Sequence, residues 1–256
     1  MGLDIDANIF LCHKDHMKKL LVFVGYDSRE DLAYEVCRHS IIRRASIPVE
    51  VIPVKHRKLR EQKLFWRPWL IRGDGQTIDC VDGLPFSTEF SHTRFLVPEL
   101  AKKMVRTGFC LFVDCDFLFL EDIKKLFDLG NTDYAVQCRK FQFHPASEKK
   151  MDGMIQSSYD RKLWSSLCLW NLDHWGTQSL TPTIVNRESG RWLHQFSWLQ
   201  ENNIGEIPEA WNSIVGDDEV PKAVHYTEGG PWFEGYVKCQ YGHLWLKERD
   251  HLRNSL

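Results

Sequence analysis

The stretch LFVDCDFLFL, residues 111–120, decides the reading of the fold because it holds two carboxylates within an apolar run. Eight of its ten residues are apolar, and the exceptions are Asp114 and Asp116. An unpaired buried charge is costly, so a partner must neutralise these side chains. Side chains two residues apart in a strand point to the same face, and we therefore expect the two carboxylates to converge.

The position of this pair, at the end of a buried strand, indicates what the partner is. Open α/β sheets place their ligands outside the carboxyl ends of their strands. Converging carboxylates offer hard oxygen ligands of the kind that Mg²⁺ and Mn²⁺ prefer. The stretch thus predicts a divalent-metal site, while helix capping or pairing with a nearby arginine is the alternative for these acids.

The segments around this stretch alternate between apolar runs and helical patterns. The run KKLLVFVG at 18–25 predicts a buried strand, and apolar spacing predicts a helix over 30–45. This rhythm predicts an α/β fold with a mainly parallel sheet, and without repeats or linkers we expect a single domain over 1–256. Further strands are expected over 49–54, 109–113, 134–138 and within 163–172, further helices over 91–105 (interrupted or divided at Pro98), from 121 onward and over 188–203, and a loop over 73–85.

Composition narrows the class of protein. The 256 residues carry a net charge of −2, so no overall field favours nucleic acid or an anionic membrane. The eight cysteines contain no C-x-x-C pair and lie mostly in apolar runs, which favours reduced thiols in a cytoplasmic protein over disulfides or a zinc site. No apolar stretch reaches the roughly 18 residues of a membrane span, so no transmembrane segment is expected, although peripheral membrane contact stays open.

Several motifs along the chain occur in an order that is similar to that of one enzyme family. The segments are VFVGYDSRE (22–30), FSHTRFLVPEL (90–100), GFCLFVDCDFLFLEDIKKLF (108–127), WSSLCLWNLDHW (164–175), EIPEAWN (206–212) and HYTEGGPWF (225–233). They resemble the motifs of glycosyltransferase family 8, the group of glycogenin and the bacterial lipopolysaccharide galactosyltransferases. The resemblance spans about residues 19–233.

This resemblance implies a GT-A fold, in which a Rossmann-like, mostly parallel sheet is flanked by helices and joined by a small additional sheet. It implies a nucleotide-sugar-binding half at about 19–140 and an acceptor and catalytic half at about 141–240. The activity that it implies is transfer of a sugar from a UDP-sugar to a hydroxyl of a glycan, lipid-linked or protein acceptor. Retention of the anomeric configuration is expected.

The resemblance also implies roles for individual residues around the metal and the donor sugar. Asp114, Asp116 and His225 correspond to ligands of Mn²⁺ or Mg²⁺, an ion that offsets the charge on the departing diphosphate. Arg94 corresponds to an arginine close to the sugar and diphosphate, with a helix-surface ion pair as the alternative. Gln195 corresponds to the amide of the family's Asp-Gln-Asp, and we expect it and Arg94 to act in catalysis.

Three consecutive residues correspond to the family's first nucleotide loop. The resemblance implies that Tyr26, Asp27 and Ser28 contact uracil and ribose, with Tyr26 stacking on the base. A helix cap formed by Asp27 or Ser28 is the alternative, and both roles are compatible.

The loop after His225 departs from the family pattern, because Gly230 stands where a phosphate-binding lysine is usual. Either the backbone N–H groups of Gly229 and Gly230 bind the diphosphate, or a basic residue elsewhere replaces the lysine. The candidates for such a residue are Lys63, Arg67 and Lys238.

A second departure concerns the mechanism. His194 and Phe196 stand where the family has acids, so this position offers no carboxylate nucleophile. A front-face reaction, in which the leaving phosphate helps to deprotonate the acceptor, is then implied. Two alternatives stay open: an inverting GT-A enzyme with Glu228 or Asp218 as base, and a catalytically degenerate domain that only binds nucleotide or carbohydrate.

Overall fold

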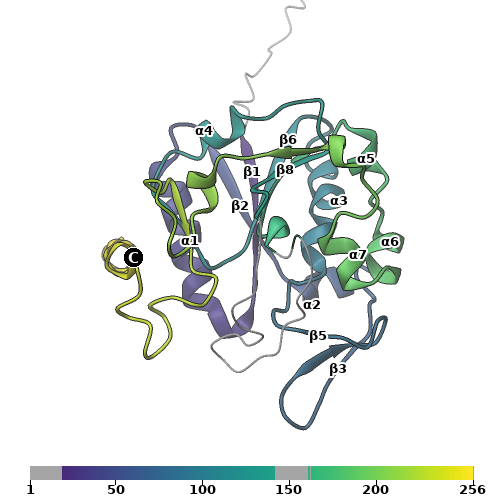
Figure 1. Ribbon diagram of the computed structural model, residues 1–256, viewed down its shortest axis with the longest axis horizontal. Helices are drawn as coiled ribbons and strands as arrows, with labels where there is room; N and C mark the ends of the chain where they lie inside the picture. The colour runs from purple at the N-terminus through teal and green to yellow at the C-terminus, as the bar shows by residue number, and fades with distance from the viewer. Residues whose placement is uncertain (1–18, 142–160, 162, 256) are drawn as a thin grey trace, which may run out of the picture.

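The structure is a computed structural model that describes residues 19–141, 161 and 163–255, and it has a central sheet with helices on both sides (Figure 1). Its strands are β1 (Leu20–Gly25), β2 (Val49–Val54), β3 (Trp69–Ile71), β4 (Thr77–Asp79), β5 (Pro85–Phe86), β6 (Phe109–Val113), β7 (Phe117–Phe119), β8 (Val136–Cys138), β9 (Leu167–Asn171), β10 (Ile204–Glu206) and β11 (Ala223–His225).

The helices vary in length from single turns to more than three turns. The α-helices are α1 (Asp31–Arg44), α2 (His56–Glu61), α3 (Val97–Lys102), α4 (Lys124–Phe127), α5 (Trp175–Gln178), α6 (Pro182–Arg187), α7 (Gly190–His194) and α8 (Gly242–Asn254). Short 3₁₀ helices lie at Ser28–Glu30, Thr93–Leu96, Trp164–Ser166, Glu201–Asn203 and Glu209–Asn212. In the part of the chain that the structure describes, no helix is long and apolar enough to span a membrane.

The main sheet has six strands in the order β10-β8-β9-β6-β1-β2. β1 pairs in parallel with both β2 and β6, and β10 pairs in parallel with β8. β9 runs antiparallel to β6 and β8, so the predicted mainly parallel sheet is confirmed with one reversed strand. β2 lies on one side of β1, and β6, which follows later in the chain, lies on the other side. The carboxyl ends of β1 and β6 therefore form a topological switch point.

Two smaller sheets supplement the main one. β7 pairs with β11, and β3, β4 and β5 form an antiparallel sheet that projects from the body (Figure 1). The expectation of a loop over 73–85 was therefore partly wrong, because Thr77–Asp79 pairs with Trp69–Ile71 despite the surrounding Gly and Asp residues.

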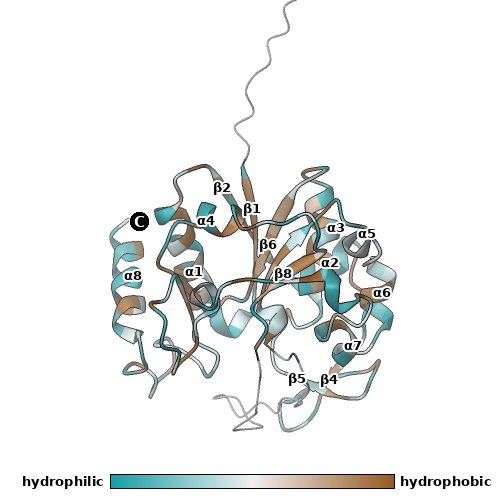
Figure 2. Cartoon of the chain, turned by 45° about the horizontal axis from the view of Figure 1, so that its top comes forward, coloured by the Kyte–Doolittle hydropathy of each residue, from teal (hydrophilic) through white to brown (hydrophobic). Residues whose placement is uncertain are grey.

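Local sequence explains the main elements. The β1 residues from Leu21 to Val24 are buried on both faces, as expected for a strand with parallel neighbours on both sides. On α1 the buried residues recur at helical spacing, and they are Ala33, Tyr34, Val36, Cys37, Ser40 and Ile41. The hydropathy colouring places the apolar strands at the centre and more polar helices outside (Figure 2).

Two predicted helices are shorter than expected. The segment 91–105 divides into the 3₁₀ helix Thr93–Leu96 and α3, with Pro98 in the first turn of α3, where its missing N–H costs nothing. The segment 188–203 was wrongly predicted as one helix. α7 ends at His194, and Phe196 takes a left-handed conformation with φ 52°, which breaks the helical path.

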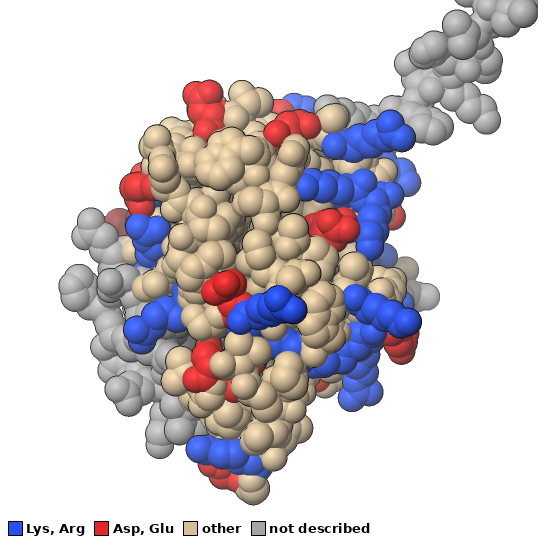
Figure 3. Space-filling model, turned by 90° about the vertical axis from the view of Figure 1, so that its right-hand side faces the viewer, with Lys and Arg blue, Asp and Glu red and all other residues tan. Residues whose placement is uncertain are grey.

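The surface carries charges of both signs. On the side of the molecule that holds α5, α6 and α7, Figure 3 shows acidic groups scattered among basic groups, the latter gathered along one edge. This mixture agrees with the net charge of −2 for the whole chain.

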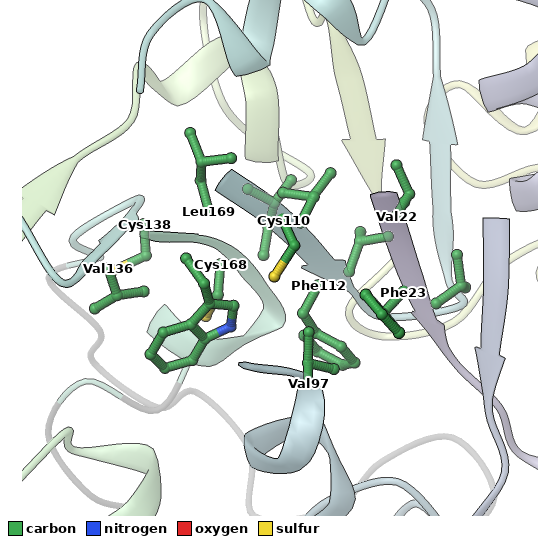
Figure 4. Packing of buried hydrophobic residues seen from close by; sticks show 14 of the residues in the cluster. Val22, Phe23, Val97, Cys110, Phe112, Val136, Cys138, Cys168 and Leu169 are labelled. Atoms are coloured by element: carbon green, nitrogen blue, oxygen red, sulfur yellow. The ribbon is translucent and has the colours of Figure 1, made fainter. Parts of the chain in front are cut away.

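The core contains thiols as well as aliphatic and aromatic side chains. Cys110, Cys138 and Cys168 pack with Val22 and Phe112 between β1, β6, β8 and β9 (Figure 4). Burial raises the pKa of all three thiols, so they stay protonated. They are core fillers and not nucleophiles.

Candidate functional site

Asp114 and Asp116 lie in the turn directly after β6, at the switch point of the sheet. This is the expected position, at the end of a buried strand, and the two side chains converge as expected. Side-chain atoms of Asp114, Asp116 and His225 all lie within 4.8 Å of one another. Cys115 between the two acids is buried, and burial raises the pKa of its thiol.

The sheet of β7 and β11 brings His225 to the two acids. Phe117, the residue after Asp116, pairs with His225 in the antiparallel register, and their rings stack at 4.2 Å. The chain is tied on both sides of this pair, because the N–H of Tyr226 donates to the carbonyl of Asp116 at 3.0 Å. The backbone therefore fixes a histidine beside a carboxylate 109 residues earlier in the sequence.

A chain of hydrogen bonds determines which nitrogen of His225 carries hydrogen. The hydroxyl of Ser166 donates to the carbonyl of Leu163 at 2.7 Å and accepts from Nδ2 of Asn212 at 3.0 Å. The amide oxygen of Asn212 therefore faces Nδ1 of His225, at 2.9 Å. An amide oxygen only accepts, so Nδ1 must donate.

The hydrogen on Nδ1 determines what the second ring nitrogen of His225, Nε2, can bind. With hydrogen on Nδ1, the neutral imidazole presents a lone pair at Nε2, which lies 3.4 Å from Oδ1 of Asp116. A lone pair and a carboxylate oxygen repel unless a cation or a proton lies between them. Two carboxylates, one imidazole nitrogen and a buried amide that orients the imidazole are the donor set and the support expected of a divalent-metal site. The residues fit such an ion.

Arg94 faces the same acids. Its guanidinium lies 2.9 Å from Oδ1 of Asp114 and donates to the carbonyl of Ser165 at 2.9 Å. Arg94 is only 7% exposed, so the alternative of a helix-surface ion pair does not hold. Asp114 thus pairs with an arginine, while both carboxylates converge with His225.

A pocket opens beside Asp116. One side of it comes from the 226–233 loop and the other from the start of α1 and the segment after β5. Its lining residues are Glu30, Ser87, Thr88, Asp116, Tyr226, Thr227, Glu228, Gly229, Trp232 and Phe233. Sequence reasoning did not single out these three lining residues: Glu30 ends the motif at 22–30, and Ser87 and Thr88 precede the motif at 90–100.

The loop of Tyr26, Asp27 and Ser28, which was expected to contact uracil and ribose, makes several contacts within the protein. Asp27 is fully buried and caps the 3₁₀ helix at Ser28–Glu30, so the capping alternative is confirmed. Burial opposes its ionisation, but hydrogen bonds from Arg29 outweigh this effect and lower the pKa of Asp27. Ser28 donates to Glu89 at 2.7 Å. A nucleotide contact from either side chain stays a prediction.

Both the hydroxyl group and one face of the ring of Tyr26 make contacts within the protein. Its hydroxyl donates to Asp31 at 2.6 Å, and this bond raises the pKa of Tyr26 to about 12. The ammonium of Lys55 lies 3.8 Å above the ring, which occupies one face by a cation–π contact. A base that stacks on Tyr26 must use the opposite face or displace Lys55.

Gly229 and Gly230 determine the backbone conformation and the packing of the 226–233 loop. The N–H of Gly229 donates to the carbonyl of Tyr226 at 2.7 Å, and its φ of 113° suits only glycine. A Cβ on Gly230 would lie 2.0 Å from the ring of Trp232, so this ring packs directly on the backbone. Because the Gly229 N–H is used in the turn, diphosphate binding by this group would require the turn to open.

Of the basic residues considered as a replacement for the missing lysine, Arg67 is ruled out. It is fully buried, and its guanidinium bonds both carboxylate oxygens of Asp79, with 2.9 Å from Nε to Oδ1. Its remaining nitrogen donates to the carbonyl groups of Val185 and Glu188. These bonds use four of its five N–H donors, and the full burial of the side chain keeps it away from a phosphate.

The segment with Gln195 lies on the Arg94 side of the site. Gln195 directly follows α7, and His194, the last residue of α7, contacts the hydroxyl of Ser165 through Nδ1 at 2.6 Å. Ser165 also accepts from Arg94 through its carbonyl. The structure thereby connects His194 to Arg94 through Ser165.

Comparisons with known proteins place the chain. No family model matches it. Protein CDI of Arabidopsis thaliana is 46% identical over 241 residues, an alignment that covers 91% of this chain and 87% of CDI.

Solved structures share the fold at low identity. WbbM, a bifunctional glycosyltransferase, superposes with a TM-score of 0.60 at 15% identity over 92% of this chain, which spans about half (51%) of WbbM. GlyE, a glycosyltransferase of Streptococcus pneumoniae TIGR4, gives a TM-score of 0.55 at 15% identity over 93% of this chain and 63% of its own. The galactosyltransferase LgtC, solved with donor and acceptor sugar analogues, gives 0.51 at 13% identity over 93% of this chain and 100% of its own. The GT-A fold class predicted from the sequence is confirmed.

Proposed function

The chain belongs to the family of the Arabidopsis thaliana protein CDI, and we propose that it is a metal-dependent glycosyltransferase that uses a UDP-sugar as donor. The proposal rests on one observation above all. Asp114, Asp116 and His225 meet at the switch point of a GT-A sheet, and Nε2 of His225 lies 3.4 Å from Oδ1 of Asp116. One fold can host many activities, so the proposed activity is argued from the chemistry of these three residues and not from the fold alone.

The metal role follows from the donor set. We propose that Asp114, Asp116 and His225 hold Mn²⁺ or Mg²⁺, which when bound offsets the negative charge that develops on a departing UDP. Asn212 keeps the Nε2 atom of His225 available by accepting from Nδ1. The ion would also screen the repulsion between the carboxylates and the diphosphate, which is the reason for placing two acids next to a nucleotide.

Arg94 is proposed to assist at the same phosphate. Its guanidinium is pre-positioned by Asp114 and by the carbonyl of Ser165, so it loses little conformational freedom when it binds an anion. Gln195 follows His194 on this side of the site, and we propose that its amide contacts the donor sugar. Both residues are catalytic candidates because they flank the place where the leaving group separates.

The stereochemistry of transfer is proposed to be retention. His194 and Phe196 flank Gln195, so no carboxylate at this position competes for a covalent role. Glu228 supports the inverting alternative, because it lines the pocket beside Asp116, whereas Asp218 does not. The anomeric configuration of the first product, measured by NMR before mutarotation, decides between the two.

The remaining parts of the proposal concern the domain boundaries, the acceptor and the cellular compartment. We propose that residues 1–256 act as a single domain whose acceptor is a glycan, a lipid-linked sugar or a protein. The described cysteines are free thiols, most of them buried, which supports a reducing compartment such as the cytoplasm.

Calorimetry with UDP tests the function most cheaply. We expect UDP to bind in Mn²⁺ or Mg²⁺ and to lose most of its affinity in EDTA, and a panel of UDP-sugars to show slow metal-dependent hydrolysis. Metal-dependent UDP binding without turnover of any donor would favour the degenerate binding domain. UDP binding of equal strength in EDTA would reject the metal role.

A further inference from the structure

The C-terminal helix α8 stands apart from the main core. It lies at the edge of the molecule beside α1 (Figures 1 and 2). Together with β7, β11 and one position of α1 it encloses a second apolar cluster. The buried members of this cluster are Val36, Leu118, Val224, Tyr226 and Trp245.

A buried glutamate fastens α8 to α1. Glu248 is 2% exposed and accepts two hydrogen bonds from Arg43, at 2.9 and 2.8 Å. Arg44 lies 2.8 Å and the Nδ1 atom of His39 lies 2.7 Å from the same carboxylate. A carboxylate buried this deeply is stable only when such partners satisfy it, so α8 is held in one position on α1.

The same helix contacts the loop that lines the pocket. The ring of Trp245 lies 5.4 Å from that of Trp232, and Trp232 meets Tyr226 edge to face at 5.8 Å. The hydroxyl of Tyr226 donates to the carbonyl of Tyr241, the residue before α8, at 3.0 Å. Both Tyr226 and Trp232 line the pocket.

The loop continues directly to the metal-facing acids. The N–H of Tyr226 donates to the carbonyl of Asp116, and His225 precedes Tyr226 in the chain. A displacement of Trp232 or Tyr226 would therefore change the pocket wall next to Asp116 while leaving β1 and β6 in place. The helix α8 is therefore in contact with the wall of the pocket, although it comes later in the chain than the residues that form the site.

We propose that Glu248 and Trp245 are positioning residues for nucleotide binding. They hold the 226–233 loop against the Asp116 turn and so set the affinity for the nucleoside diphosphate of the donor. This inference rests on the proposed function for the identity of the ligand. It assigns to the C-terminal helix a role in the pocket, although no residue of α8 lines it.

The experiment compares Glu248→Gln with wild type and with Glu35→Gln. Glu35 lies on α1, the helix that Glu248 contacts, but it pairs with Arg38 of the same helix at the surface, which makes it a matched control. Hydrogen exchange of the 226–233 backbone is measured beside that of β1, and UDP binding is measured by calorimetry with Mn²⁺. We expect faster exchange in 226–233 with β1 unchanged, and a Kd for UDP about tenfold higher, in Glu248→Gln only.

A second pair of measurements separates positioning from general damage. With any donor that turns over, Glu248→Gln should raise KM about tenfold and leave kcat within about twofold, and Glu248→Asp should recover part of the affinity. Unchanged exchange in 226–233, or equal effects in Glu35→Gln, would overturn the inference. If wild type binds no UDP, the proposed function fails by itself, and the exchange data still decide whether α8 holds the loop.

Discussion

The two sides of the candidate site rest on different parts of the fold. Asp114 and Arg94 project from segments next to β6 that pack into the main core, with partners at 2.9 Å. The 226–233 loop instead packs on the second cluster and on α8, through ring contacts of 5.4 to 5.8 Å and one hydroxyl. The first side is held by the main sheet. The second side is held by α8, which the ion pairs of Glu248 hold on α1.

This difference suggests a division of labour. Groups that handle developing charge must be pre-positioned, because reorganisation during the reaction costs rate. A wall that contacts a nucleotide tolerates small displacements at the expense of affinity. We therefore expect substitutions on the sheet side to affect metal binding and turnover, and substitutions on the loop side to affect donor affinity.

The largest effect is expected for Asp116→Asn on the sheet side. The amide keeps the shape but removes a charged metal ligand, so kcat/KM should fall by about 10³-fold while the fold is retained. Initial rates with saturating Mn²⁺ provide the measurement. Asp128→Asn is the control, since Asp128 forms a surface pair with Lys124. Activity of Asp116→Asn equal to that of the control would remove Asp116 from the mechanism.

The next effect concerns the residue behind the metal ligand. Asn212→Leu removes the acceptor that fixes the hydrogen of His225 on Nδ1, and Mn²⁺ affinity should fall about 10- to 100-fold. Titration of Mn²⁺ by electron paramagnetic resonance measures this affinity without turnover. Ser213→Ala, at the adjacent buried position, should leave it unchanged. A loss of the same size in both variants would point to general disruption of this segment.

On the loop side, Gly230→Ala sharpens the comparison. The new Cβ would lie 2.0 Å from the Trp232 ring, so this ring must leave its position in the pocket wall. We expect KM for the donor to rise about tenfold and Mn²⁺ affinity without nucleotide to stay the same. Gly73→Ala serves as the control, because nothing lies within 4 Å of its Cβ position. A loss of Mn²⁺ affinity in Gly230→Ala would contradict the separation of the two sides.

The last effect concerns the stability of the fold in acid and not the activity. Burial of Glu248 opposes its charge, but hydrogen bonds from Arg43, Arg44 and His39 outweigh burial and lower its pKa from 4.5 to about 2. A lowered pKa stabilises the fold above the unfolded value and loses this contribution as pH falls from about 4.5 toward 2. The contribution amounts to about 3 kcal/mol of unfolding free energy. Urea unfolding from pH 6 to pH 3 should show a steeper loss in wild type than in Glu248→Gln, and parallel curves would contradict it.

Much of the sheet side could be predicted from the sequence. The apolar runs at 20–25 and 109–113 are continuous and bounded by Gly or Asp, so their burial in a parallel sheet and the convergence of Asp114 and Asp116 follow from local pattern. His225 carries no such local signal. Its place beside Asp116 depends on the pairing of β7 with β11, and only the family resemblance indicated it.

The small sheet of β3 to β5, the buried pair of Arg67 and the helix that supports the loop side could not be predicted from local pattern. Gly73 to Pro85 is rich in turn formers, yet Thr77–Asp79 forms a strand because β3 and β5 provide partners. Arg67 was a candidate for phosphate binding until its buried pair with Asp79 became visible. The role of α8 likewise depends on Glu248 meeting Arg43, 205 residues earlier, a contact that no periodicity indicates.

The most direct test of the metal site is a crystal structure with Mn²⁺ and UDP, measured at the manganese absorption edge. We expect one strong anomalous peak bound by Asp114, Asp116, Nε2 of His225 and the diphosphate. Bound UDP with no anomalous peak at these three side chains would contradict the account.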